Sequence, residues 1–145
     1  MEQQDVFSGD YVASCRWRIE AQIAAFDLLR AQAPDDGSMD GAIEDIEDEL
    51  FNAMAGQLEG MFAYRDPAIA PAGPGPLREL TAVVTSLNAN GGRFDPPEGS
   101  GLDADTTVLG IDPGDAIRLD RDGFQELADA FFDALEEAYS DQEQA

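Results

Sequence analysis

The stretch that decides the fold is residues 120–139, DRDGFQELADAFFDALEEAY. Its apolar side chains recur at every third or fourth position, which is the spacing of one face of an α-helix. These residues are Phe124, Leu127, Phe131, Leu135 and Ala138 or Tyr139. The acids on the opposite face are largely Asp129, Asp133, Glu136 and Glu137. The stretch therefore predicts an amphipathic helix with Phe131 at the centre of its buried face.

The start of this helix carries aspartates that can act as caps. Asp120 or Asp122 can accept hydrogen bonds from the first turn, and Gln125 then completes the pattern of a capping box. Residues 120–123, DRDG, also resemble the middle of an EF-hand calcium loop, but that register puts Arg118 at the first ligand position. We therefore interpret the segment as a turn into a helix.

Two more helical stripes stand nearer the amino terminus. The first begins at the cap Asp10 and ends at residue 31, and its apolar positions are Val12, Cys15, Ile19, Ile23, Phe26 and Leu29. The second begins at Ser38 or Asp40 and ends near residue 64, and its apolar positions are Ile43, Ile46, Leu50, Met54, Leu58 and Met61. Because only the short breaker PDDG at residues 34–37 separates them, the two helices are expected to form an antiparallel hairpin.

The middle of the chain is less regular. Residues 66–76 hold four prolines and two glycines among them, so they are interpreted as an internal connection. A shorter helix is expected from Pro76 to about residue 89, although the β-branched residues in 80–87 leave a strand there as the rival. The turn sequence DPGD at residues 112–115 predicts a small β-hairpin between residues 107–110 and 116–119.

Together these segments predict a mainly α fold. It consists of a helical hairpin plus C-terminal helices with a small β-hairpin, in one compact domain that spans residues 1–145. Residues 1–9 and 140–145 are expected to fray at the two ends.

Composition excludes several classes of function. The chain has 31 acidic and 8 basic residues, a net charge of −23, and no lysine or histidine. Catalytic triads, Schiff-base lysines and P-loops therefore have no residues to build them, and zinc lacks its usual ligands. The charge disfavours direct binding to nucleic acid or to anionic membranes. One cysteine, Cys15, and no apolar span or leader favour a cytoplasmic protein in which Cys15 is a small buried hydrophobe.

The acidic residues are segregated along the chain. Residues 33–66 carry a net charge of −9 and residues 95–145 carry −13, whereas residues 67–94 carry +1. Two explanations stay open: a halophilic-like, salt-adapted composition that carries no information about partners, or a surface that a basic protein recognises.

Three groups of residues are candidates for partner binding. They are Arg16, Trp17 and Arg18 on the first helix, Glu44, Glu47 and Asp48 on the second, and Asp129, Asp133 and Glu136 on the last. Tryptophan and arginine are favoured anchors of protein interfaces, and Trp17 lies off the apolar stripe of its helix. In the alternative interpretation Trp17 covers the edge of the core while both arginines pair with acids of the second helix.

The hypothesis that these observations favour is a non-enzymatic acidic interaction module. Such a module is an adaptor, an immunity-type protein or an inhibitor that binds a basic partner, by mimicry of nucleic acid if the partner is a nucleic-acid enzyme. Homo-oligomers are left open, and no cofactor and no metal site are expected. The alternative from another class is a small carboxylate enzyme or cation-binding protein. Glu44, Glu47 and Asp48 share a helix face, as the metal ligands of helical bundles do. The histidine that accompanies such ligands is missing, so a solvated charged face is favoured at these three positions.

Overall fold

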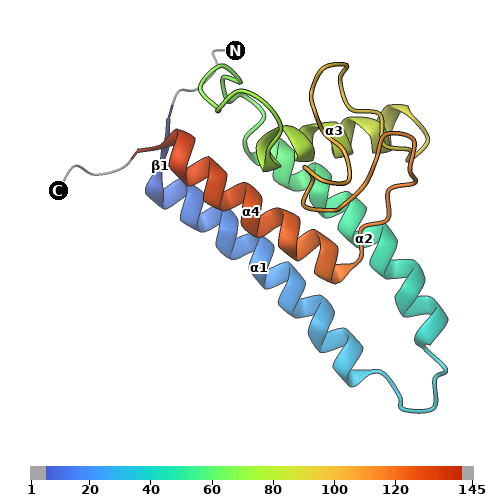
Figure 1. The fold of residues 1–145 in the computed structure, drawn as a ribbon. Coiled ribbons are helices and arrows are strands. Elements are labelled where there is room, and N and C mark those ends of the chain that lie inside the picture. Colours follow the sequence, from blue (N-terminus) through green and yellow to red (C-terminus); the bar gives the residue numbers. More distant parts are fainter. Residues whose placement is uncertain (1–5, 142–145) are drawn as a thin grey trace.

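The computed structural model describes residues 6–141 and confirms a mainly α fold (Figure 1). Its helices are α1 (Gly9–Gln32), α2 (Asp40–Met61), α3 (Pro76–Ala89) and α4 (Arg121–Tyr139). Two short strands, β1 (Phe7–Ser8) and β2 (Ser140–Asp141), pair in parallel over two residues at the ends of α1 and α4. None of the helices in residues 6–141 is long and apolar enough to cross a membrane.

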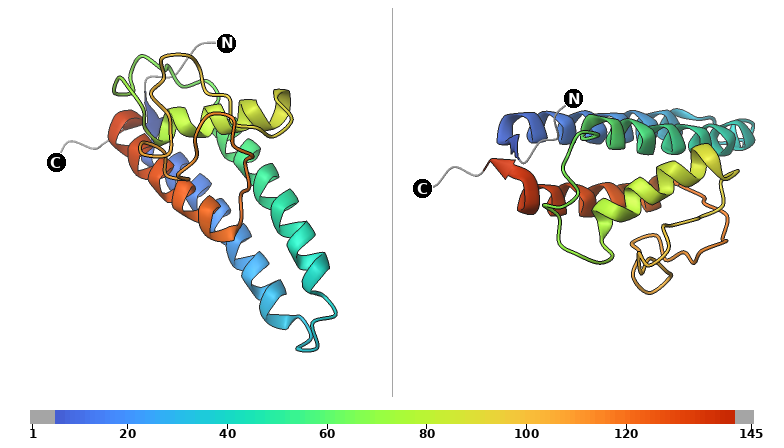
Figure 2. Two further views of the ribbon diagram at one scale, coloured as in Figure 1. Left: turned by 45° about the vertical axis from the view of Figure 1, so that its right-hand side comes forward. Right: turned by 90° about the horizontal axis from the view of Figure 1, so that it is seen from above.

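The helices pack in two layers around one core. Seen from above in Figure 2, α1 and α2 form one layer, and α3 and α4 form the other. Helices α2 and α4, one from each layer, both contact the other three helices. Phe124, Leu127, Phe131 and Leu135 are each 0% exposed. The predicted burial of Phe131 is therefore confirmed.

Local capping explains where the helices begin and end. The cap of α1 is Ser8, whose Oγ accepts from the Tyr11 N–H at 3.1 Å, and not the Asp10 suggested by the sequence. At the start of α4, Asp120 Oδ1 accepts from the Gly123 N–H at 2.8 Å. Helix α3 ends at Ala89 with Asn90 as its cap, and the chain then turns away through Gly91 and Gly92, whose φ angles of 64° and 81° favour glycine.

The rival strand at residues 80–87 is wrong, because these residues lie in α3 with Leu80 and Val83 fully buried. The predicted end of the second helix near residue 64 is three residues too late. Phe7, in the segment expected to fray, is buried with its ring centroid 5.0 Å from that of Phe62. Residues 1–5 and 142–145 lie outside the described residues.

The predicted β-hairpin at residues 107–119 is also wrong. The DPGD turn forms, with the Asp115 N–H donating to the Asp112 carbonyl at 3.0 Å. Ala116 instead makes a single antiparallel bridge with Arg93, which follows α3. The N–H groups of Val108 and Leu109 donate to the carboxylate of Glu79 at 2.7 and 3.0 Å. A buried side chain on α3 therefore takes the backbone donors that a hairpin needs.

Candidate functional site

The end of the helical hairpin formed by α1 and α2 is the most acidic part of the described chain. We call residues 33–49, the loop and the first turns of α2, the acidic tip. This segment contains eight carboxylates and no basic residue. The two helices extend beyond the start of α4, so the tip projects from the body of the molecule (Figure 1). It is therefore accessible to a large partner.

The carboxylates of the acidic tip are not equivalent. Glu44, Asp45 and Glu49 are exposed, and no arginine of residues 6–141 lies within 4.0 Å of any of them. Asp48 is half-buried, with its Oδ2 3.5 Å from Nη2 of Arg118. Asp35, Asp36 and Asp40 are exposed in the same way, and no arginine of the described residues lies within 4.0 Å of them. The free charge of the tip therefore lies on six of its eight carboxylates, in the loop and along the outer part of α2.

The expectation that Glu47 lies on a solvated face is wrong. Its exposed fraction is only 9%, and its Oε2 accepts from the Arg121 backbone N–H at 2.8 Å. Its Oε1 lies 4.0 Å from Nη2 of Arg30. Glu47 thus joins α2 to the first turn of α4, where the N–H groups of a helix have no partner within the helix. It is a structural residue and not a surface for a partner.

The acids of α4 are held by an arginine of α1. The Nη1 atom of Arg16 is 3.1 Å from both Asp133 and Glu136, and its Nη2 atom is 3.6 Å from Asp129. The guanidinium also lies 5.3 Å from the ring centroid of Phe132. Burial disfavours its charge, but the hydrogen bonds that Arg16 donates to Asp133 and Glu136 leave the pKa of Arg16 raised. The prediction that Arg16 pairs with the second helix is wrong, since its partners are on α4 and, at Glu20, on α1.

The three neighbours Arg16, Trp17 and Arg18 therefore have different environments. The indole of Trp17 is 69% exposed, the largest exposure among the exposed large apolar residues of the described chain. Arg18 is exposed as well, and the described residues place no carboxylate within 4.0 Å of it. Arg16 turns toward α4, while Trp17 and Arg18 stay on the outer side of α1. The structure thus separates an anchor of the fold from two solvent-facing side chains.

A bidentate ion pair also joins α1 to α4. Nε and Nη2 of Arg121 donate to the two carboxylate oxygens of Asp27 at 2.9 and 2.8 Å. The hydrogen bond from Arg121 holds the pKa of Asp27 below its usual value, against a smaller opposing effect of burial. Arg121 also donates to the side chain of Gln125, so Gln125 does not complete the predicted capping box. Arg16 and Arg121 together neutralise much of the charge between the two helices.

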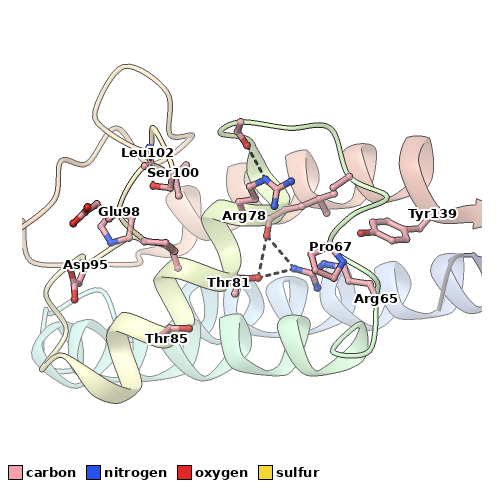
Figure 3. Close-up of a pocket in the computed structure, with 17 residues that line it drawn as sticks. Arg65, Pro67, Arg78, Thr81, Thr85, Asp95, Glu98, Ser100, Leu102 and Tyr139 are labelled. Atoms are coloured by element: carbon pink, nitrogen blue, oxygen red, sulfur yellow. Dashed lines mark hydrogen bonds between the residues drawn. The ribbon is translucent and has the colours of Figure 1, made fainter. Parts of the chain in front are cut away.

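A cavity that the sequence did not reveal lies beside α3. It has a volume of about 700 Å³ and is bounded by the Pro-rich connection, by α3 and by the loop at residues 95–102 (Figure 3). Leu77, Leu102 and several prolines form its apolar part. The only indication in the sequence is that residues 67–94 are the one segment with a positive net charge.

Two arginines line this cavity and differ in their bonding. Arg65 is almost buried and donates to Glu59 at 3.1 Å and to Thr81 at 2.8 Å, so its charge is paired. Nε and Nη2 of Arg78 donate to the carbonyls of Gly73 and Pro71 at 2.9 and 3.1 Å. Among the carboxylates of residues 6–139, none lies within 4.0 Å of Arg78. Arg78 fixes the connection and keeps an uncompensated charge.

Glu79 lies on the opposite side of α3, and no arginine of the described residues lies within 4.0 Å of its carboxylate. It is 0% exposed, and its two carboxylate oxygens accept only from the backbone of Val108 and Leu109. Burial raises the pKa of Glu79, and the two backbone hydrogen bonds offset part of that rise. The carboxylate thereby holds the long loop between α3 and α4 against the helix.

The remaining chemistry of the described chain is limited. Cys15 is buried, as predicted, and no group of three or more histidine, cysteine, aspartate or glutamate side chains in residues 6–141 is placed to hold a metal ion. Comparison with protein-family models, with curated proteins and with solved structures gives no match.

Proposed function

We propose that this protein is a non-enzymatic interaction module that binds a basic protein through its acidic tip. The observation that supports the proposal is the contrast in pairing: Glu44, Asp45 and Glu49 are exposed without an arginine within 4.0 Å in the described chain, whereas the acids of α4 converge on Arg16. Charge that is already neutralised within the chain attracts a partner weakly. The tip therefore carries the recognition.

Electrostatics set the behaviour expected of such a module. A projecting group of like charges steers an oppositely charged protein into encounter, so association is fast at low salt and slows steeply as salt rises. A nucleic-acid enzyme is a suitable partner class, because its phosphate-binding groove accepts carboxylates spaced along a helix. The module then acts as an inhibitor by mimicry; as an adaptor or immunity-type protein it uses the same surface on another basic partner.

The test is affinity capture from the native host at about 0.1 M salt, where the Debye length is about 10 Å. The chain is compared with a tip variant, Glu44→Gln with Glu49→Gln, and with a matched variant, Glu126→Gln with Glu137→Gln, which removes the same charge from α4. We expect a stoichiometric basic partner that is lost with the tip variant and kept with the matched one. Equal capture by both variants, or capture of no stoichiometric partner, contradicts the proposal and favours salt adaptation as the reason for the charge.

A second function is favoured by the cavity beside α3. In a chain with 31 acids and 8 bases, Arg78 is half-buried without a carboxylate within 4.0 Å among residues 6–139, and it lines a cavity of about 700 Å³. Pockets of roughly 300–1,000 Å³ with an apolar lining and few polar groups hold small molecules. This site fits a small apolar carboxylic acid, whose carboxylate meets Nη1 of Arg78 and whose body lies against Leu77 and Leu102.

This second function is tested by titrating the chain with aliphatic and aromatic carboxylic acids while the side-chain N–H signals of arginine are followed by NMR. Saturable shifts of the Arg78 side-chain N–H signal are expected in the parent chain. In the variants the backbone amide signals of the lining residues Leu77 and Leu102 are followed instead, and their saturable shifts should persist in part in Arg78→Lys and vanish in Arg78→Gln. Arg93→Gln is the matched control, because Arg93 also lacks a carboxylate within 4.0 Å in the described range but does not line the cavity. Shifts that are linear in acid concentration exclude a binding site.

A further inference from the structure

Helix α1 has a second apolar face that nothing in the described chain covers. Its core face consists of Val12, Cys15, Ile19, Ile23 and Phe26. On the opposite side, apolar residues recur at alternating steps of four and three, and we call them the outer stripe: Trp17, Ala21, Ala24, Leu28 and Ala31. Trp17 is 69% and Leu28 is 61% exposed. This spacing is the a/d pattern of a helix that packs lengthwise on another helix.

The outer stripe is anchored by large side chains and not only by small ones. Tryptophan is among the residues that contribute most to protein interfaces, and an isolated exposed indole is costly in water. Trp17 and Leu28 are the two large residues of the stripe, with Ala21 and Ala24 between them. Small residues in the centre let two helix backbones approach closely, and the large residues then fill the space on either side.

From this arrangement we propose that α1 pairs with α1 of a second copy of the chain, antiparallel, through the outer stripe. The stripe is self-complementary about a two-fold axis near residues 22 and 23. Trp17 of one copy then packs against the residue at position 28 of the other, and position 21 packs against position 24. At the periphery Ala31 meets Ser14, a small residue that continues the spacing by one step. The inner layers of the seam are apolar, and the two copies contribute the same surface, as a two-fold interface requires.

The distribution of charged residues favours α1 as the surface that binds a second copy of the chain. Helix α2 carries seven acids and no base, and α4 carries six acids and one arginine, whereas α1 has three acids and three arginines. The acids that flank the stripe, Glu20 and Asp27, are paired within their own chain with Arg16 at 3.7 Å and with Arg121 at 2.8 Å. Two chains with a charge of −23 therefore repel each other less along α1 than along α2 or α4.

Charge also selects the antiparallel orientation. The acidic tip follows the carboxyl end of α1, so a parallel pair places two tips side by side. In the antiparallel pair the carboxyl end of each α1 lies about ten residues from the two-fold axis, and the two ends are on opposite sides of it. At 1.5 Å per residue the two ends are about 30 Å apart. That separation is several Debye lengths at physiological salt, where the Debye length is about 8 Å. The dimer thereby presents its two tips at opposite ends.

Sedimentation velocity of the full chain tests the pairing directly. At about 0.1 mM protein, where association with a Kd of about 10 μM is mostly complete, we expect a dimer that 1 M NaCl strengthens. Ala24→Glu should give a monomer, because it places a charge in the seam. Ile46→Glu is the matched control on an exposed apolar residue of α2 and should remain a dimer. A wild-type monomer under these conditions, or equal effects of the two variants, overturns the proposal.

Two further measurements check the contact and its orientation. Trp17 is the single tryptophan of the chain, so its fluorescence should shift to shorter wavelength as the protein is concentrated, and Ala24→Glu should abolish the shift. In a Cys15→Ala background, a mixture of Ala21→Cys and Ala24→Cys chains should form mixed disulfides in excess. A prevailing disulfide between two Ala24→Cys chains indicates a parallel pair and overturns the orientation. None of these outcomes depends on the basic partner proposed for the acidic tip.

Discussion

The acids of α4 and the acids of the tip have different surroundings. Asp129, Asp133 and Glu136 surround the guanidinium of Arg16 at 3.1–3.6 Å. Glu44 and Glu49 of the tip have no arginine within 4.0 Å in the described range. Formal charge in a sequence therefore differs from the charge that a partner meets, because each arginine neutralises the acids that the fold brings to it.

The position of each surface in the fold explains the difference. Arg16 follows Cys15 on α1 and lies at the edge of the core, where α1 packs on α4, so its guanidinium reaches the acids of that helix. The tip extends past the start of α4 (Figure 1). The arginines near it, Arg30 and Arg118, reach only Glu47 and Asp48.

The largest effect is expected from the core beneath the paired surface. Phe131 is 0% exposed and lies between the rings of Phe62 and Phe132, with centroids 5.9 Å away in both cases. Phe131→Ala should lower the free energy of unfolding by about 3–5 kcal/mol. Denaturant unfolding measures it, with Leu29→Ala, a truncation of an exposed side chain, as the control. A loss no larger than that of the control shows that α4 does not rest on the core as described.

The second prediction removes the arginine that distinguishes the two surfaces. Arg16→Met leaves Asp129, Asp133 and Glu136 facing one another, and should lower the free energy of unfolding by about 1 kcal/mol, since water screens these partly exposed carboxylates. Arg18→Met is the matched control and should change the free energy by less than about 0.5 kcal/mol. Equal effects of the two variants contradict a stabilising role of the Arg16 cluster.

The third prediction concerns pH and compares a paired carboxylate with an unpaired one. Arg121 lowers the pKa of Asp27, so the stability that this pair contributes is present above the unfolded value of about 3.9 and is lost as pH falls through the folded pKa. Burial raises the pKa of Glu79, so its contribution is fully present below about 4.3 and is lost as pH rises through the folded pKa. In carboxyl ¹³C NMR the titration midpoint of Asp27 should lie below about 3.9, and that of Glu79 should lie above about 4.3. A Glu79 midpoint at or below about 4.3 contradicts the effect of its burial.

The smallest effect is expected at the tip itself. Glu44→Gln, Asp45→Asn and Glu49→Gln together relieve repulsion and should raise the free energy of unfolding slightly, within about 0.5 kcal/mol, at 0.1 M NaCl. In 1 M NaCl, where the Debye length is about 3 Å, the gain should vanish. Asp129→Asn, Asp133→Asn and Glu136→Gln, as the matched set on α4, should lower stability. A loss of stability in both sets removes the distinction between the two surfaces.

The sequence by itself determined the helices. Periodic apolar residues and strong breakers act within a few residues of the chain, so the bounds of α1, α3 and α4 follow closely from spacing, proline and glycine. The exposure of Trp17 is consistent with its place off the stripe of the core face. Even the turn at residues 112–115 is local and forms as its residues predict.

Only the tertiary structure decided which charges and which backbone groups meet. Arg16 lies more than 100 residues from its partners on α4, and Glu79 lies about 30 residues from the amides that it binds. No periodicity specifies such pairs, because each depends on the rotation and contact of two helices or on the path of a loop. For that reason Glu47 is buried and links α2 to α4, and the backbone donors expected in the hairpin bind the carboxylate of Glu79 instead. The exposed acids of the tip, in contrast, keep their charge.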